Sequence, residues 1–101
     1  MADTKENVEN GFFVTYNHPN WSLNTYETYS KLENLNMLEI NNGASNRGSD
    51  MDYTPYVYDQ MLRLGKRISC VGGDDNHDRI HFFKAWTMVK AESLTHENIL
   101  N

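Results

Sequence analysis

The sequence lacks a second cysteine, a long apolar run and a block of basic residues. With Cys70 as its only cysteine, the chain cannot form an internal disulfide, and a reducing, cytoplasmic setting suits it best. Residues 1–10 are polar and contain no apolar stretch typical of a signal peptide, and no later run approaches the length of a transmembrane helix. We therefore expect neither export nor contact with a membrane.

The charge of the chain is acidic and evenly spread. Fourteen Asp and Glu residues against nine Lys and Arg residues give a formal net charge of -5. Non-specific nucleic-acid binding requires clustered Lys and Arg, so we predict no nucleic-acid partner. A phosphorylated small molecule is still compatible with an acidic surface, because bound cations would dominate the local field.

The length of the chain sets the size of the fold. At 101 residues it is long enough for one hydrophobic core but too short for a complete α/β barrel. An apolar fraction of 39%, with 12% aromatic residues, predicts a packed interior rather than disorder. We divide the chain into a polar N-terminal segment at residues 1–10 and a single domain at residues 11–101.

Apolar runs and helical periodicities alternate along the chain. Thr54 and Pro55 have the pattern of a helix N-terminus, and Gly65 is typical of a helix C-terminus. Asn24 and Glu27 have the spacing of a capping pair at the start of a helix of about three turns. The predicted elements are strands at 12–16, 37–40, 68–71 and 84–90, and helices at 23–35, 54–65 and 95–100. This order predicts an α/β fold with a parallel sheet and flanking helices.

Side chains that can bind metals occur at or near the ends of three of these strands. His18 follows the first strand, Glu39 lies within the second, and Asp75 and His77 follow the third. The carboxyl ends of parallel strands open at one edge of a sheet, so these groups should converge. Imidazole and carboxylate suit Zn²⁺, Mn²⁺ or Fe²⁺, and two such metals could activate water for phosphoester hydrolysis. We predict a divalent-metal site formed by His18, Asp75 and His77.

Each of these residues also has a simpler interpretation. A histidine before proline is often only a turn residue, and loops rich in Asp and Gly often only satisfy turn geometry. Glu39 could face solvent or a salt-bridge partner. Arg47, in the loop after the second strand, could bind a substrate phosphate, although loop arginines are usually only solvated. His81 and His96 are expected at the surface.

Five short motifs occur in a characteristic order. They are Asn-His-Pro-Asn-Trp at 17–21, Leu-Glu-Ile-Asn-Asn at 38–42, Leu-Gly-Lys-Arg-Ile at 64–68, Val-Gly-Gly-Asp-Asp-Asn-His at 71–77 and Ala-Glu-Ser-Leu-Thr at 91–95. In this order they resemble the later motifs of the polymerase-and-histidinol-phosphatase (PHP) family, over residues 11–101. The resemblance implies a distorted (β/α)₇ barrel that holds up to three metal ions and hydrolyses phosphoesters.

The resemblance also implies roles for single residues. His18 matches the histidine of the family's His-Pro motif, and Asp75 and His77 match its final Asp-x-His pair, although Asp74 leaves open which aspartate is the ligand. Glu39 lies in a strand that the family uses mainly as structure. The family's opening His-x-His motif, and the histidines and bridging glutamate after it, have no counterpart here. We therefore expect a truncated PHP-like domain, a partial barrel whose partial site binds metal weakly and turns over little or no substrate alone.

Two other functions are compatible with the sequence. A non-catalytic interaction or oligomerisation module could derive from a PHP domain, because cutting a barrel leaves two unpaired strand edges. Residues 12–14 should be covered by the N-terminal segment, by a rearranged strand or by another copy of the chain. A missing N-terminal half is the other partner that the resemblance implies. An ordinary small α/β binding domain, in which the metal-ligand pattern is a coincidence, is the third interpretation.

Overall fold

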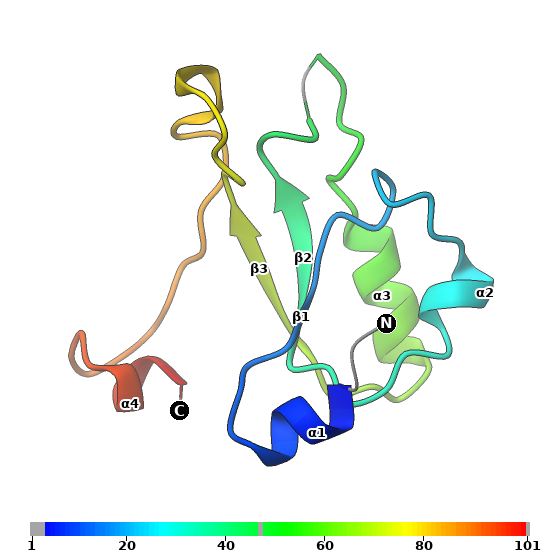
Figure 1. Ribbon diagram of the computed structural model, residues 1–101, viewed down its shortest axis with the longest axis vertical. Helices are drawn as coiled ribbons and strands as arrows, with labels where there is room; N and C mark the ends of the chain where they lie inside the picture. The colour runs from blue at the N-terminus through cyan, green and yellow to red at the C-terminus, as the bar shows by residue number, and fades with distance from the viewer. Residues whose placement is uncertain (1–3, 47, 101) are drawn as a thin grey trace.

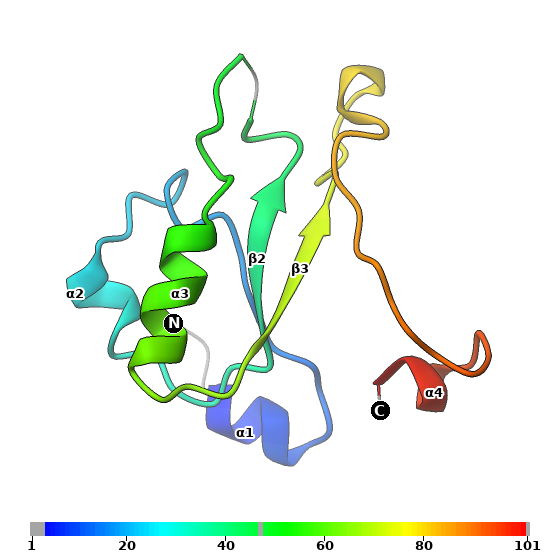
Figure 2. The ribbon, with the colours of Figure 1, turned by 180° about the vertical axis from the view of Figure 1, so that it is seen from behind.

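The computed structural model describes residues 4–46 and 48–100 and is built on a three-stranded parallel sheet. Strands β1 (Thr15–Tyr16), β2 (Met37–Asn42) and β3 (Ser69–Gly73) lie side by side in chain order, and β2 is the central strand. Figures 1 and 2 show β2 and β3 running in the same direction from opposite views. The predicted α/β class and parallel sheet are confirmed.

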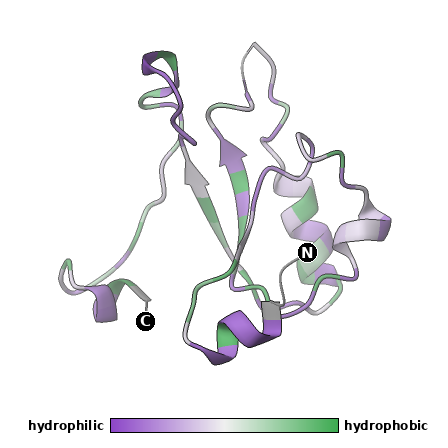
Figure 3. Cartoon of the chain, viewed as in Figure 1, coloured by the Kyte–Doolittle hydropathy of each residue, from purple (hydrophilic) through white to green (hydrophobic). Residues whose placement is uncertain are grey.

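Two helices connect the strands and lie on the same side of the sheet (Figure 1). They are α2 (Tyr26–Tyr29) and α3 (Pro55–Arg63). Figure 3 shows both hydrophobic and hydrophilic stretches along β2, and Leu38 of this strand is fully buried. The buried core consists of Tyr29, Leu32, Leu38, Val57 and Met61. The core therefore lies between β2 and the two helices.

Helix α3 forms where the sequence predicted it, although the Thr54 side chain at its N-terminus makes no capping hydrogen bond. Pro55 occupies the first turn, where its missing N–H costs no helical hydrogen bond. Val57 and Met61, one turn apart, are fully buried. Gly65 has φ +81 directly after the last turn, a conformation that glycine adopts without strain.

Helix α2 is much shorter than predicted and spans only Tyr26–Tyr29. The expected capping pair does not form, because the Asn24 side chain accepts from the Tyr16 hydroxyl and donates to the Ser22 carbonyl instead. The chain then leaves the helix, and Asn34 has φ +58 in the turn before β2. Tertiary contacts of Asn24 therefore overrode the local pattern.

The first strand is also shorter than predicted. Only Thr15 and Tyr16 pair with β2, while Phe12 and Phe13 are 63% and 45% exposed. An unpredicted helix, α1 (Thr4–Glu9), precedes them within the polar segment. The described chain therefore leaves these two aromatic side chains largely uncovered.

The predicted fourth strand at residues 84–90 does not form a ladder. The segment, the orange trace in Figure 1, passes the end of β3 on its outer side and then diverges from the strand toward α4, and Thr87 alone bonds to the strand. Its hydroxyl accepts from the Gly72 N–H at 3.0 Å and donates to the Gly72 carbonyl at 2.7 Å. A Cβ on Gly72 would lie 3.0 Å from the Trp86 carbonyl oxygen, so glycine permits this close approach.

The chain ends in helix α4 (His96–Leu100). The Thr95 hydroxyl accepts from the Asn98 N–H at 3.2 Å and so caps the helix predicted at residues 95–100. In the described parts of the chain, no helix is long and apolar enough to cross a membrane.

Candidate functional site

The three predicted metal ligands line one cavity. His18, Asp75 and His77 surround a space of about 590 Å³, together with Trp21, Ala44, Ser45, Met51 and His81. His18 follows β1, and the other two predicted ligands follow β3, so the cavity lies at the carboxyl edge of the sheet. Within residues 4–46 and 48–100, however, no three His, Cys, Asp or Glu side chains form a group that could hold a metal ion. The three side chains share a cavity without forming a closed ligand set.

The loop that carries His18 is strained and firmly held. His18 has φ +30, an unfavourable value for a residue with a side chain, which costs of order 1–3 kcal/mol. The His18 N–H donates to Glu39 Oε2 at 2.9 Å. The buried Asp52 carboxylate accepts from the N–H groups of Asn20 and Trp21, at 2.8 and 3.2 Å. These bonds fix the direction in which the loop presents His18.

A buried asparagine links this loop to Asp75. Asn42 Nδ2 donates to Glu39 Oε2 and to Asp75 Oδ2, both at 3.1 Å. Asn42 Oδ1 accepts from the Ser45 N–H at 2.9 Å, so the amide is satisfied on both sides. The sequence assigned Glu39 a mainly structural role, and the structure adds that it connects both ligand loops. The Glu-x-x-Asn spacing within β2 is the sequence feature that could have indicated the contact between Glu39 and Asn42.

The two adjacent aspartates have different roles. The Asp74 carboxylate accepts three backbone N–H bonds of 2.7 to 2.8 Å, from Phe83, Lys84 and Ala85. These bonds, that of Ala85 foremost, lower the pKa of Asp74. Asp75, with φ +50, turns toward Asn42 and the cavity instead. This geometry favours Asp75 over Asp74 as a ligand.

Hydrogen bonds determine which imidazole nitrogens could bind a metal. His77 Nδ1 lies 2.6 Å from the Asp75 carbonyl oxygen, which only accepts, so Nδ1 carries the proton. The Nε2 lone pair of neutral His77 is then available to a metal, as in many metal-binding histidines. His18 Nδ1 bonds to the Ser22 hydroxyl at 2.9 Å, which can serve as donor or acceptor. Both histidines are therefore compatible with ligation through Nε2.

Two sequence predictions about other residues have different outcomes. His81 was expected at the surface, but it is only 6% exposed, and its Nδ1 accepts from the His77 N–H at 3.0 Å. That expectation was wrong, and the apolar neighbours Ile80 and Phe82 were the only local signal for burial. Arg47, the predicted phosphate-binding residue, lies outside the described residues.

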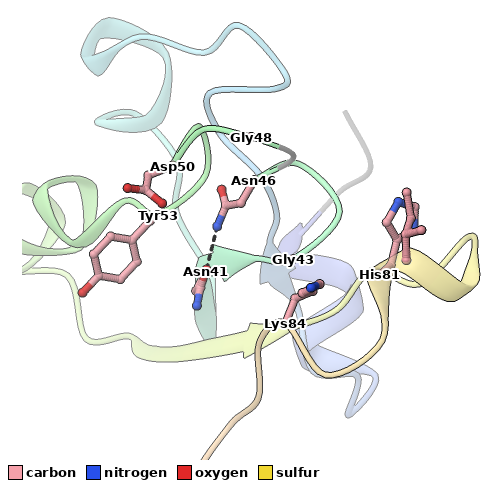
Figure 4. A pocket seen from close by; sticks show the side chains of 9 residues that line it. Asn41, Gly43, Asn46, Gly48, Asp50, Tyr53, His81 and Lys84 are labelled. Atoms are coloured by element: carbon pink, nitrogen blue, oxygen red, sulfur yellow. Dashed lines mark hydrogen bonds between the residues drawn. The ribbon is translucent and has the colours of Figure 1, made fainter.

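A second cavity, of about 550 Å³, shares His81 with the first. Figure 4 shows Tyr53 and Asp50 on one side of it and His81 on the other, with Lys84 between them along the lower wall. Gly43 is essential to this wall, because a Cβ there would lie 2.6 Å from the Lys84 Cβ. The loop after β2 and the turn after β3 therefore meet at this cavity.

Comparisons of the chain with protein-family models, with curated proteins and with solved structures gave no match.

Proposed function

We propose that this chain is the C-terminal part of a PHP-type metal-dependent phosphoesterase, with His18, Asp75 and His77 as metal ligands. The observation that carries the proposal is that His18, far from Asp75 and His77 in sequence, lines one cavity with them at the carboxyl edge of a parallel sheet. This is the edge at which α/β proteins place their functional groups. The PHP family is proposed from the order of the five sequence motifs.

The arrangement of strands and helices supports a partial barrel. The strands follow one another in chain order, and both α2 and α3 lie on one side of the sheet. Consecutive β/α units of a barrel have this arrangement, whereas a doubly wound sheet carries helices on both faces. We infer that the chain corresponds to successive β/α units of a larger barrel.

The donor groups fit a divalent transition metal. Two imidazoles that can present Nε2, together with the Asp75 carboxylate, suit Zn²⁺, Mn²⁺ or Fe²⁺. When bound, such a metal would hold a phosphoryl oxygen of a phosphorylated small molecule and lower the pKa of a water molecule. Asn42 and Glu39 would keep Asp75 and the His18 loop in place. Arg47 remains our proposed contact for the substrate phosphate.

We expect the chain alone to bind metal weakly and to turn over little substrate. Three ligands that do not form a closed set leave a metal without the bridging carboxylate and second metal that the family's chemistry uses. A polypeptide that supplies the bridging carboxylate and the remaining ligands would complete the site.

Calorimetric titration with Zn²⁺ or Mn²⁺ tests the proposed ligands. We expect His18→Ala, His77→Ala and Asp75→Asn each to weaken binding about tenfold or more. Asp74→Asn is the matched control, because it removes the adjacent carboxylate while keeping an acceptor for the Lys84 and Ala85 N–H groups, and it should bind as the wild type does. Binding unchanged in all three ligand variants would refute the assigned site.

A phosphatase assay tests the expected low activity. The purified chain with added Mn²⁺ should hydrolyse a generic phosphoester no faster than its Asp75→Asn variant. Robust hydrolysis that Asp75→Asn abolishes would show that the site is complete in this chain.

A second candidate function is a non-catalytic interaction or oligomerisation module. The observation that favours it is the group of large apolar side chains left exposed, among them Phe83, Trp86, Met88 and Leu94. Exposed apolar surface on this scale is typical of a protein interface. Low activity together with stable self-association would favour this function over the first.

A further inference from the structure

The hydrogen bonding of His81 fixes the position of its proton. His81 Nδ1 accepts from the His77 backbone N–H at 3.0 Å. A neutral imidazole has one donor nitrogen and one acceptor nitrogen, so the proton of neutral His81 is on Nε2. His77 has the opposite arrangement, with its proton on Nδ1 and its Nε2 lone pair available. The centroids of the two rings lie 6.0 Å apart. Nε2 of His77 can therefore bind a metal, whereas Nε2 of His81 can donate a hydrogen bond.

The Nε2–H of His81 has no hydrogen-bond partner within the described chain, although the residue is only 6% exposed. A buried donor without an acceptor is unfavourable and rare in folded proteins, and it calls for a missing partner. A metal ion cannot be that partner, because it needs a nitrogen lone pair and Nε2 carries a proton. The missing partner must be an acceptor, and an anionic oxygen is the strongest one.

The surroundings of His81 indicate where such an acceptor would bind. His81 is part of the wall of both cavities, the one with the proposed metal ligands and the one with Lys84. Lys84 adds a positive charge and further N–H donors to the second cavity. Asp50, the acidic residue of that cavity, lies on the side away from His81 in Figure 4. An anion in the second cavity would therefore have both His81 and Lys84 in the surrounding wall.

We propose that His81 is a substrate-binding residue that donates its Nε2–H to an anionic phosphate oxygen at the junction of the two cavities. The identity of the anion as the phosphate of a phosphoester rests on the proposed function. Nε2 is shielded from solvent, so the ring must turn to bring its N–H to the anion. This assigns a phosphate contact that does not depend on Arg47.

A pair of substitutions separates this role from a merely structural one. His81→Asn keeps an oxygen near the position of Nδ1, where it can accept from the His77 N–H, but it has no donor at the position of Nε2. His81→Gln keeps a donor near Nε2 and loses the Nδ1 acceptor. The probe is inorganic phosphate, titrated without metal by calorimetry and by nitrogen NMR of the imidazoles, with a chloride titration as the ionic-strength control. His96→Asn, at an exposed histidine of α4, is the matched control variant.

We expect His81→Asn to weaken phosphate binding about tenfold and His81→Gln to retain most of it, because an ionic hydrogen bond has about this effect on a dissociation constant. His96→Asn should have no effect. Phosphate binding that survives His81→Asn but is lost in His81→Gln would overturn the proposal in favour of a positioning role for Nδ1.

The wild-type spectrum provides a test that does not depend on folding of the variants. We expect His81 as the Nε2–H tautomer, with a resonance that shifts on addition of phosphate. An Nδ1–H tautomer, or an Nε2 resonance that phosphate leaves unmoved, would overturn the proposal. Loss of metal binding in the ligand variants is a separate measurement, so the proposed function and the role of His81 can fail independently.

Discussion

The helix-covered side of the sheet and the segment beyond the β3 edge differ in how well their apolar side chains are covered. On the helix side, Leu38, Val57 and Met61 are fully buried. Beyond β3, Leu94 is 95% exposed and Phe83 90% exposed, in a segment that contacts the strand mainly through Thr87. Both regions contain the large apolar side chains from which cores are built, and only one has partners for them. In the described residues, the apolar side chains of this C-terminal segment are thus much more exposed than those between β2 and the helices.

The largest difference should appear when one leucine on each side is truncated. We expect Leu38→Ala to lower the free energy of unfolding by about 2–5 kcal/mol, because it leaves a cavity in the only core of the described chain. Leu94→Ala makes the same chemical change and should alter it by no more than about 0.5 kcal/mol. Urea denaturation of both variants gives the two values. Equal losses would mean that the C-terminal segment packs in solution.

The next effect concerns a polar anchor on the covered side. Asp52→Ala leaves the N–H groups of Asn20 and Trp21 without their acceptor and should cost about 1.5–3 kcal/mol. The exposed Asp50 is the control, and its replacement by Ala should cost far less. Urea denaturation measures the stability, and the amide resonances of Asn20 and Trp21 report the loop. Unchanged resonances in Asp52→Ala would show that the His18 loop is held by other contacts.

The uncovered side should affect association rather than folding. If copies of the chain pair through this segment, Trp86→Ser removes a large apolar side chain from the interface and should raise the dissociation constant roughly tenfold or more. Tyr26→Ser, at an exposed aromatic residue on the helix side, is the control and should leave association unchanged. Sedimentation over a range of concentrations measures both. A monomer at all concentrations would exclude self-association and leave a different chain as the partner.

The smallest effect is on the pH dependence of stability. Because hydrogen bonds lower the pKa of Asp74 in the folded chain, the stability that they provide is fully present above the unfolded value of about 3.9. This contribution is lost as the pH falls through the lower folded value. Asp74→Asn should therefore flatten the decline in stability below about pH 4. Denaturation curves collected across that range measure the change, and identical slopes would mean that the turn at residues 83–85 is held by other contacts.

The elements that could be predicted were those determined locally. Helix α3 carries its own signals in Pro55, Gly65 and the spacing of Val57 and Met61, and all of them function as expected. The length of α2 was not predictable, because the Asn24 side chain bonds to Tyr16 in β1 instead of capping the helix. A contact of this kind depends on the fold and leaves no local pattern.

The candidate site, like the fold, was predictable only in part. Parallel strands alone imply that His18, Asp75 and His77 lie at one edge of the sheet, and the structure places them around one cavity. The apolar neighbours of His81 gave only a weak indication of its burial, because that burial depends on how the turn after β3 folds back onto the loop after β2. The choice of Asp75 over Asp74 likewise required the three backbone bonds of Asp74.

At the outer edge of β3, the Thr87 hydroxyl competes with any adjacent strand for the backbone groups of Gly72. By bonding both the N–H and the carbonyl of Gly72, one side chain occupies the two groups that an adjacent strand would use there. An incoming strand must exchange those two bonds for its own, so its affinity is reduced by whatever the hydroxyl contributes. A strand that pairs with this edge must therefore form more hydrogen bonds than the two that it displaces from Thr87. The hydrogen-exchange rate of the Gly72 amide reports how often that edge is open.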